Sequence, residues 1–454
     1  MGNFFTLAAG MGIHQSWGNF YAGNTDNRFI RIISTNSNFE REPLALPFGF
    51  KGGYLSELWQ NMVCLKTMDH AEIGLSTQSV LYCDPNIFTS NSEAAGNAMM
   101  FCVTERALQL VKNEPFVTPI DLFQKVFPRL QEMAPKLTGL DKVNDIFLLN
   151  ALASVDNAAW RLYVAENHLS GFDEMVPPEY RLALAARNIR IGIMFQVSYK
   201  MPVTEIVRNV DLGYFIIKIK IGQPGSQREM LEKDVARITE IYVALKNEET
   251  AQTKDRKLLF NLDANGRYET KALLQELIAH LKEIGIYSQI LLIEEPLSES
   301  NQEYVGDLGI RIGADESARD EQTTLARIGL GYTVIVLKPA AKTLSLSFKI
   351  AKIAYAHQLP CICSDLTVNP VLVDWQKNLI ARMAPFPGLS MAIMETNGKE
   401  NYKNWEAMCH YLPNKDASWE KIQNGMFTLD DGFYNQSGGL FEPLPHYRSL
   451  LGKS

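Results

Sequence analysis

Short apolar segments alternate with longer amphipathic ones from about residue 186 onward, and this alternation limits the fold more than any other feature of the sequence. The segment YFIIKIKIG, residues 214–222, has the length and β-branched content of a buried strand, and SQREMLEKDVARITEIYVALKN, residues 226–247, has helical spacing. Strands that alternate with helices of this length form a parallel sheet. The number of repeats favours a closed barrel over an open sheet, so we predict an α/β barrel over residues 186–410.

The N-terminal part of the chain has a different pattern. Apolar runs separated by turn residues come first and predict strands, and helical spacing follows up to about residue 168. We therefore predict an α+β domain over residues 28–185, with an N-terminal extension, residues 1–27, before it. The Pro-, Gly- and Phe-rich stretch EPLALPFGFKGG, residues 42–53, is predicted to be a loop. Residues 411–454 form a separate C-terminal segment.

Acidic residues end or follow three successive predicted strands. Asp263 ends the run LLFNLD, Glu294 ends LLIE, and Asp315 follows IGA. In a parallel barrel the carboxyl ends of the strands meet at one mouth, where active sites are built. Three carboxylates gathered there repel one another unless a positive charge lies among them. A hard divalent cation with oxygen ligands, most simply Mg²⁺, meets this requirement.

Lysines stand at the ends of the strands before and after these carboxylates. Lys218 and Lys220 project to the same side of their strand, and Lys338 follows the run TVIVL. A buried ammonium group needs a counter-charge or a solvated cavity, so we expect all three at the mouth, with Lys220 and Lys338 on opposite sides. Such a pair suits removal of the proton next to a substrate carboxylate, when a cation stabilises the resulting enediolate. The base has to be neutral, and the charge of Lys218 is expected to lower the pKa of Lys220.

The motifs KIK, DAN, IEEP, ADES and LKP resemble, in order and spacing, those of the enolase superfamily, muconate lactonizing enzyme subgroup. The resemblance covers roughly residues 28–445 and includes ALASVDNAAW ahead of the barrel. Enzymes of this superfamily use a lysine or histidine base together with Mg²⁺. The resemblance implies a (β/α)7β TIM-like barrel with an N-terminal α+β capping domain, and a C-terminal segment, residues 411–454, that returns to the cap.

The resemblance also implies a role for each matching position. The implied metal ligands, for Mg²⁺ with Mn²⁺ as a substitute, are Asp263, Glu294 and Asp315. The implied acid and base are Lys220 and Lys338, with Lys218 as an electrostatic helper. Asn265 is implied beside the metal, either in its outer shell or as a substrate contact. Phe48 and Phe50 are implied substrate contacts, since PLALPFGFKGG, residues 43–53, resembles the specificity loop of the capping domain.

Two departures from the family pattern bear on the substrate. Mandelate-type racemases carry a histidine on the seventh strand, whereas this strand reads PCICSDLTVNP, and His357 precedes it on a predicted helix as a packed or surface residue. Chemistry with two lysines is therefore favoured.

Dipeptide epimerases carry D-x-D after the eighth strand, where the acidic pair holds the substrate ammonium. Here the sequence reads E-x-N, which leaves Glu395 to bind an amine with help from Asp365, and a solvated loop is the alternative.

These observations favour a Mg²⁺-dependent racemase or epimerase of an amino-acid or dipeptide-type substrate, in which one lysine removes the α-proton and the other returns it. The same enediolate serves a muconate-type cycloisomerase or an o-succinylbenzoate synthase-like lyase, which need only one lysine as base. A non-catalytic carboxylate-binding protein is a more remote alternative.

Composition limits the partners. The net charge is −7, and no basic stripe or arm is present, which argues against nucleic acid. Six scattered cysteines without ligand spacing are interpreted as reduced core thiols. The N-terminal stretch MGNFFTLAAGMGI is too short to span a bilayer and lacks the basic region of a signal peptide. It matches a loose sequence pattern for N-myristoylation. The alternative interpretation is that it is the remnant of an export signal. We expect a cytoplasmic protein that binds a small carboxylate substrate and no membrane, and that forms a homo-oligomer.

Overall fold

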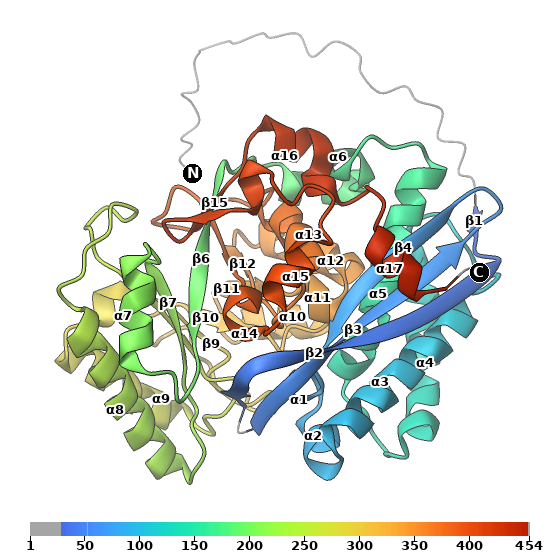
Figure 1. Ribbon diagram of the computed structural model, residues 1–454. Coiled ribbons are helices and arrows are strands. Elements are labelled where there is room, and N and C mark those ends of the chain that lie inside the picture. Colours follow the sequence, from blue (N-terminus) through green and yellow to red (C-terminus); the bar gives the residue numbers. More distant parts are fainter. Residues whose placement is uncertain (1–28, 52, 453–454) are drawn as a thin grey trace, which may run out of the picture.

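The structure is a computed structural model that describes residues 29–51 and 53–452 (Figure 1). The N-terminal extension, residues 1–27, with its myristoylation pattern and export reading, lies outside the described residues.

Eight parallel strands form a closed barrel, as the alternating pattern predicted. In chain order they are β6 (Arg190–Val197), β7 (Ile216–Lys220), β8 (Leu259–Asp263), β9 (Ile290–Glu294), β10 (Ile312–Ala314), β11 (Val334–Leu337), β12 (Cys361–Cys363) and β13 (Ala392–Glu395). Each strand pairs with the next along the chain, and β13 pairs with β6 to close the ring. The closure brings the carboxyl ends of all eight strands to one mouth.

Helices connect most of the strands on the outside of the barrel. They are α7 (Val203–Asp211), α8 (Gln227–Leu245), α9 (Lys271–Glu283), α10 (Glu321–Gly329), α11 (Pro339–Lys342), α12 (Leu344–Ala356) and α13 (Pro370–Ile380), with a 3-10 turn η2 (Tyr287–Gln289) before β9. The connection from β9 to β10, residues 295–311, has no helix. This connection contains Pro296, Gly306 and Gly309, which favour turns.

The N-terminal domain is an antiparallel sheet backed by helices. Its strands are β2 (Ser34–Phe50), β3 (Gly53–Lys66) and β4 (Ala71–Gln78), and a small pair is formed by β1 (Ile30–Arg31) and β5 (Pro115–Phe116). Its helices are α1 (Val80–Cys83), α2 (Pro85–Ser90), α3 (Glu93–Val111), α4 (Pro119–Thr138), α5 (Asp145–Glu166) and α6 (Phe172–Met175), followed by the 3-10 turn η1 (Pro178–Leu184).

The prediction of a loop over residues 42–53 was wrong. The strand β2 continues to Phe50 and pairs with β3, with an irregularity between Pro43 and Phe48 where the register shifts. A proline is tolerated there because β2 is the edge strand of the sheet, so the missing N–H removes no bond to a further strand.

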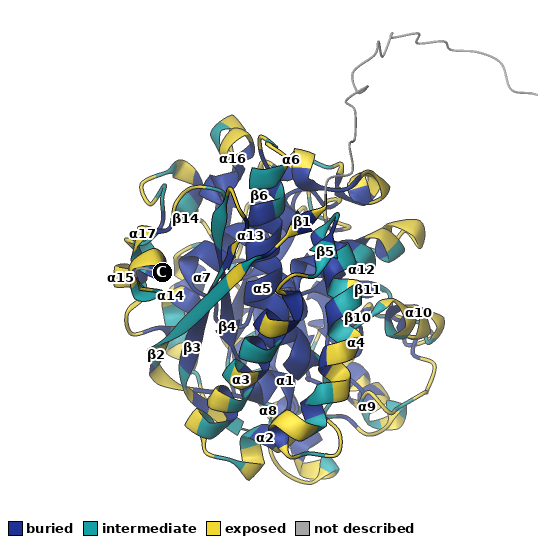
Figure 2. Ribbon diagram, turned by 90° about the vertical axis from the view of Figure 1, so that its right-hand side faces the viewer, coloured by how far each residue is buried: buried dark blue, intermediate teal, exposed yellow. Residues whose placement is uncertain are grey.

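Helix α5 lies between the N-terminal sheet and the barrel and is buried along nearly its whole length (Figure 2). On the sheet side, β4 approaches so closely that a Cβ at Gly74 would lie 2.0 Å from the carbonyl oxygen of Ser154. On the barrel side, the indole of Trp160 donates to the hydroxyl of Ser345 and stacks edge-on with Phe348, both on α12. The two domains therefore share one continuous apolar core around α5.

The C-terminal segment contacts both domains. Its elements are η3 (Ser418–Glu420), β14 (Ile422–Gln423), β15 (Met426–Thr428), α16 (Asp431–Gln436), η4 (Ser437–Gly439) and α17 (Pro445–Leu450), and the short helices α14 (Gly398–Asn401) and α15 (Trp405–Cys409) lie between β13 and this segment. The β14–β15 hairpin pairs antiparallel with β6 of the barrel. The end of the segment then meets the N-terminal domain, where Asn36 and Asn38 donate to the backbone carbonyls of Leu451 and Leu450.

All six cysteines are free thiols. Cys83, Cys361 and Cys363 are buried, but Cys102 is exposed on α3, so its prediction as a core thiol was wrong. Within residues 29–51 and 53–452, no helix combines the length and the apolar character that crossing a bilayer requires.

One buried carboxyl group joins the two domains and should make folding stability depend on pH. Asp156 on α5 accepts hydrogen bonds from the backbone N–H of Ser345, at 3.0 Å, and from its hydroxyl. Burial raises the pKa of Asp156 from 3.8 to about 6 in spite of these bonds. A carboxyl group with a raised pKa in the folded state contributes its full stability below pH 4 and loses it as the pH rises through about 6.

We therefore expect the free energy of unfolding of the wild type to fall between about pH 4 and pH 6, by about 3 kcal/mol from this group. The Asp156→Asn variant, which cannot ionise, should lack this part of the pH dependence. Urea unfolding of both proteins across this range measures the difference, and parallel curves would contradict the role of Asp156.

Candidate active site

The predicted site residues meet at the carboxyl end of the barrel. Lys218 and Lys220 point into the barrel from β7, Asp263 and Glu294 end β8 and β9, and Asp315 directly follows β10. Lys338 follows β11, Asp365 comes shortly after β12, and Glu395 ends β13. All of these side chains are buried, so none is a solvated strand end.

The ammonium group of Lys218 is the centre of this cluster and is 1% exposed. Its Nζ lies 3.0 Å from Asp263, 2.9 Å from Glu294 and 2.8 Å from Glu395. The hydroxyl of Ser364 accepts a fourth contact from Lys218 at 2.9 Å and donates to Glu395 at 2.6 Å. Lys218 therefore holds together groups from strands on both sides of β7.

Lys220 belongs to a second chain of contacts that leads to the N-terminal domain. Its Nζ donates to Asp263 at 2.6 Å and to the side-chain oxygen of Asn265 at 3.1 Å. The amide nitrogen of Asn265 donates to Glu316 at 3.0 Å, and Glu316 lies 3.4 Å from the ammonium group of Lys51 in the β2–β3 turn. Asn265 thus positions the predicted base rather than standing free at the mouth.

Asp315 is surrounded by donors. Its carboxylate accepts from Lys338 at 2.6 Å, from the hydroxyl of Tyr82 at 2.8 Å and from Lys342 at 3.2 Å. The Nζ of Lys338 also lies 3.8 Å from the centre of the Tyr82 ring, a cation–π contact. The backbone N–H of Asp315 donates to Glu295 at 2.7 Å, so the second glutamate of IEEP holds the end of β10 in place.

Burial and charge divide these groups into two classes. Burial would raise the pKa of Asp263, but Lys218 and Lys220 outweigh it and hold the value at about 2. In the same way Lys338 and Lys342 keep the pKa of Asp315 below its usual range. Burial, followed by the charge of a neighbouring carboxylate, raises the pKa of Glu294 to about 7 and that of Glu295 to about 8. Burial would lower the pKa of Lys338, but Asp315 raises it above its usual value.

A small cavity separates Lys220 from Lys338. About 20 Å³ is open to the centre of a water-sized sphere, which is room for roughly one water molecule. The lining side chains are Phe48, Phe50, Leu55, Ser79, Tyr82, Gln196, Lys220, Lys338, Asp365, Leu366, Thr367, Glu395 and Asn397. Phe48 and Phe50 therefore lie over the mouth, at the end of the β2–β3 hairpin.

The two predicted amine-binding carboxylates are already engaged. Glu395 pairs with Lys218 and Ser364. Asp365 accepts from the backbone N–H groups of Leu366, Val368 and Asn397 at 2.6 to 3.1 Å, which shapes the turn after β12. Burial and then the nearby Glu395 raise the pKa of Asp365 to about 7. Both residues line the cavity, so neither belongs to a solvated loop.

A divalent cation fits the charge of this site but not the present positions of its side chains. Seven carboxylates are linked in this network with five ammonium groups: Asp263, Glu294, Glu295, Asp315, Glu316, Asp365 and Glu395 with Lys51, Lys218, Lys220, Lys338 and Lys342. The described residues contain no group of three Asp, Glu, His or Cys side chains arranged to hold a metal. Instead, Lys218 lies between Asp263 and Glu294, which would have to exchange its ammonium group for the cation.

Sequence reasoning missed several residues of the site. Lys342 lies four residues after Lys338, a spacing that places both on one side of a helical turn. Ser364 directly follows a predicted strand, and Glu316 belongs to the ADES motif, so the sequence pattern could have placed both residues at the mouth of the barrel. No sequence pattern could have linked Tyr82 to the site, because 233 residues separate it from Asp315. His357 is exposed at the end of α12, away from the site, as the sequence had suggested.

Comparison with known proteins finds similarity in structure only. No family model matches the chain, and no curated protein sequence matches it. The L-Ala-D/L-Glu epimerase from Bacillus subtilis superposes with a TM-score of 0.62 at 14% identity, over 88% of this chain and 97% of that one. The N-succinyl Arg/Lys racemase from Bacillus cereus gives 0.61 at 14% identity, over 88% and 93%.

A muconate lactonizing enzyme from Mucobacterium smegmatis also gives 0.61 at 14% identity, over 88% of this chain and 94% of that one. The chain has the fold of these enzymes. The barrel with an N-terminal cap that the resemblance implied is therefore confirmed. The lysines and carboxylates of this chain meet at the carboxyl end of the barrel, the end at which active sites of such barrels are built.

The two lysines that contact Asp315 should differ in their importance for stability. Lys342 donates to the backbone carbonyls of Asp315, Ala318 and Val336 at 2.7 to 3.4 Å, whereas Lys338 donates only to the carboxylate of Asp315. Lys342→Met removes a buried ammonium donor that the Asp315 carboxylate and three carbonyl oxygens share, and we expect it to lower the free energy of unfolding by about 3 kcal/mol or more.

Lys338→Met is the matched control for this prediction. It leaves Asp315 paired with Lys342 and Tyr82, so its cost should be clearly smaller. Urea unfolding at neutral pH measures both. A larger loss for Lys338→Met than for Lys342→Met would show that this assignment of roles is wrong.

Proposed function

We propose that this chain is an enolase-superfamily isomerase that removes the proton next to a substrate carboxylate and returns it through two lysines. The observation that carries the proposal is the placement of Lys220 and Lys338. They come from β7 and β11, which stand four places apart in a ring of eight strands and therefore face each other across the barrel. Both ammonium groups line the same small cavity.

This opposition favours racemisation or epimerisation over the other reactions. An α-carbon held between the lysines presents one face to each, so one lysine takes the proton and the other delivers it from the opposite side. Lys338, whose pKa Asp315 raises, is protonated at neutral pH and starts as the acid. Cycloisomerisation and elimination need a single base and give no reason for a second lysine on the far wall.

The substrate that we propose carries an amine as well as a carboxylate, as an amino acid or dipeptide does. Glu395 and Asp365 line the cavity and provide negative charge where an ammonium group could compete for Glu395. Known proteins with this fold include the L-Ala-D/L-Glu epimerase and the N-succinyl Arg/Lys racemase. The small volume of the cavity and the burial of its lining side chains support the proposal, because exclusion of water strengthens the electrostatic contacts on which an enediolate depends.

We also propose a Mg²⁺ ion as cofactor, held by Asp263, Glu294 and Asp315. When bound, it would supply positive charge to the developing enediolate. The excess of carboxylates over ammonium groups and the raised pKa of Glu294 support a place for added positive charge. The protein's own part is to hold the substrate between the two lysines and to exclude water with Phe48, Phe50 and Tyr82.

The test of the base is α-proton exchange. Purified protein with Mg²⁺ in D₂O is incubated with pooled dipeptides, N-acyl amino acids and amino acids, and deuterium uptake is measured by mass spectrometry. Lys220→Ala should abolish exchange of one stereoisomer, because it removes the base on one face only, and Lys338→Ala should abolish exchange of the other. Exchange of both stereoisomers by Lys220→Ala would remove Lys220 as a base.

The test of the metal uses the two adjacent glutamates of IEEP. Glu294→Gln should weaken Mg²⁺ binding at least about tenfold, because it replaces a proposed ligand by a neutral amide. Glu295→Gln changes the same charge at an equally buried position that holds Asp315 and Ser317, so it should change affinity much less. Isothermal titration calorimetry gives both values. Equal affinities would remove Glu294 from the ligand set.

A further inference from the structure

A buried carboxylate that the proposed reaction does not use lies behind the strand end that carries Lys220. Asp234, on α8, is fully buried. It accepts hydrogen bonds from the backbone N–H groups of Gly222, at 2.7 Å, and Gln223, at 3.3 Å, and from the hydroxyl of Tyr268, at 2.9 Å. All three partners donate, which is the pattern of an ionised carboxyl group. Hydrogen bonds to neutral groups, rather than an ion pair, therefore offset the cost of burying it.

The two backbone N–H groups belong to the turn that ends β7. Lys220 is the last residue of β7, and Gly222 follows two residues later with a left-handed backbone, φ 80°. A Cβ at Gly222 would lie 2.7 Å from the Cβ of Arg267 and 2.9 Å from the carbonyl oxygen of Ala264. The turn therefore packs directly against the segment that follows β8, at a distance that only glycine allows.

The hydroxyl of Tyr268 ties that second segment to Asp234. Tyr268 comes three residues after Asn265, whose side-chain oxygen accepts from the Nζ of Lys220 at 3.1 Å. The backbone N–H of Tyr268 donates to the carbonyl oxygen of Pro296, in the connection after β9, at 3.1 Å. Asp234 thus joins the backbone next to Lys220 with the segment that contacts the other end of the Lys220 side chain.

The opposed lysine is fixed in a different way. Lys338 is followed at once by α11, and its carbonyl oxygen accepts from the backbone N–H groups of Ala341, at 3.0 Å, and Lys342, at 2.8 Å. No helix follows β7 directly, because α8 begins only at Gln227. A buried acceptor on α8 therefore holds the backbone beside Lys220, where helical hydrogen bonds hold that of Lys338.

We propose that Asp234 is a positioning residue for Lys220: it fixes the end of β7 and the neighbouring segment so that the Nζ of Lys220 stays in line with the α-carbon of the substrate. The role of Lys220 as a base rests on the proposed function, whereas the hold of Asp234 on the strand end does not. A misplacement of about 1 Å in a reacting group can lower a rate on the order of a hundredfold, so loss of this hold has a kinetic signature.

The two stereoisomers of the substrate separate this role from a general loss of stability. The isomer that Lys220→Ala fails to exchange identifies the α-proton that Lys220 removes. Asp234→Ala should lower the rate of α-proton exchange of that isomer at least about tenfold relative to the isomer that Lys338 deprotonates. Both rates are measured on one preparation, so their ratio does not depend on the fraction of folded protein.

Asn188→Ala is the matched control. Asn188 is buried at the opposite end of the barrel, where its side chain accepts from the backbone N–H of Ala392, at the start of β13, and donates to the carbonyl oxygen of Met383. Its removal also leaves buried backbone groups without a partner, but far from the mouth, so the ratio of the two rates should stay unchanged. An unchanged ratio in Asp234→Ala, or an equal change in Asn188→Ala, would overturn the proposal.

Asp234→Asn covers the case in which Asp234→Ala does not fold. The amide offers one acceptor oxygen to three donors and turns its own N–H groups toward at least one of them. The same isomer should therefore lose exchange in this variant, by a smaller factor than in Asp234→Ala. A ratio equal to that of the wild type would count against the positioning role in the same way.

Backbone hydrogen exchange tests the hold without the reaction. In the Asp234 variants, amide hydrogens of residues 216–223 should exchange faster than in the wild type, whereas those of residues 334–342 should keep their rates, as measured by mass spectrometry. Equal protection of residues 216–223 in all proteins would refute the hold. A wild type that exchanges no α-proton but shows this difference would contradict the proposed reaction and leave Asp234 as the residue that positions Lys220.

Discussion

The buried ammonium group of Lys218 is the interaction on which the mouth of the barrel depends. Removing a charge from water costs several kcal/mol, and only closely placed carboxylates with further hydrogen bonds offset that cost. Lys218 finds them on the neighbouring strands β8 and β9 and on β13, which comes close only through its pairing with β6, so the full set of ion pairs forms only when the ring is closed. Closure of the barrel and assembly of the site are therefore the same event in energetic terms.

The N-terminal domain supplies side chains that cover the mouth of the barrel. It contributes Tyr82, which contacts both Asp315 and Lys338, and the hairpin end with Phe48 and Phe50, which covers the cavity. These side chains leave little room for water, so the charges beneath them act in a medium of low dielectric constant. The fixed position of this domain follows from α5, which is packed against the sheet through Gly74 and against α12 through Trp160.

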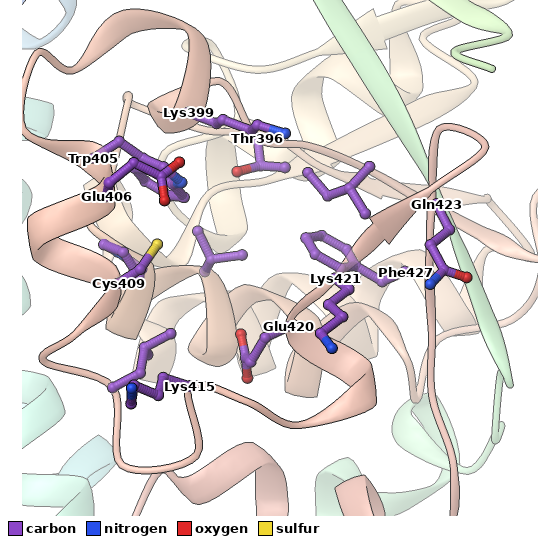
Figure 3. Close-up of a pocket in the computed structure, with 14 residues that line it drawn as sticks. Thr396, Lys399, Trp405, Glu406, Cys409, Lys415, Glu420, Lys421, Gln423 and Phe427 are labelled. Carbon is purple, nitrogen blue, oxygen red and sulfur yellow. The ribbon is translucent and has the colours of Figure 1, made fainter. Parts of the chain in front are cut away.

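The segment at residues 395–397 stands between two cavities of different character. The inner one is small and lined by the opposed lysines, and the outer one, between α13, α15 and the β14–β15 hairpin, is larger and combines an apolar wall with charged groups (Figure 3). Adjacent residues of an extended segment point to opposite sides, which is why one short stretch serves both. The geometry offers a physical route between the two, through the contact of Glu395 with Lys218.

Much of the barrel fold and of the candidate site could be predicted from the amino-acid sequence. Periodicity predicted the strands and helices of the barrel, because burial on both faces of a parallel sheet leaves continuous apolar runs. The alternation of side chains placed Lys218 and Lys220 on one side, and polar residues at successive strand ends predicted that Lys220, Asp263, Glu294, Asp315 and Lys338 would meet. Residues 42–53 were misread as a loop, because the tolerance of an edge strand for proline depends on which strand has no neighbour.

Only the tertiary structure decided which groups pair at the mouth. Tyr82 reaches Asp315 across 233 residues, and the ammonium group of Lys218 lies between Asp263 and Glu294 where the sequence suggested a cation. The contact of Glu420 with Lys377 likewise became visible only when the C-terminal segment was placed against α13. The reason is physical: periodicity reports which side of its own element a side chain faces, whereas charge pairing and exclusion of water depend on distances between elements far apart in the chain.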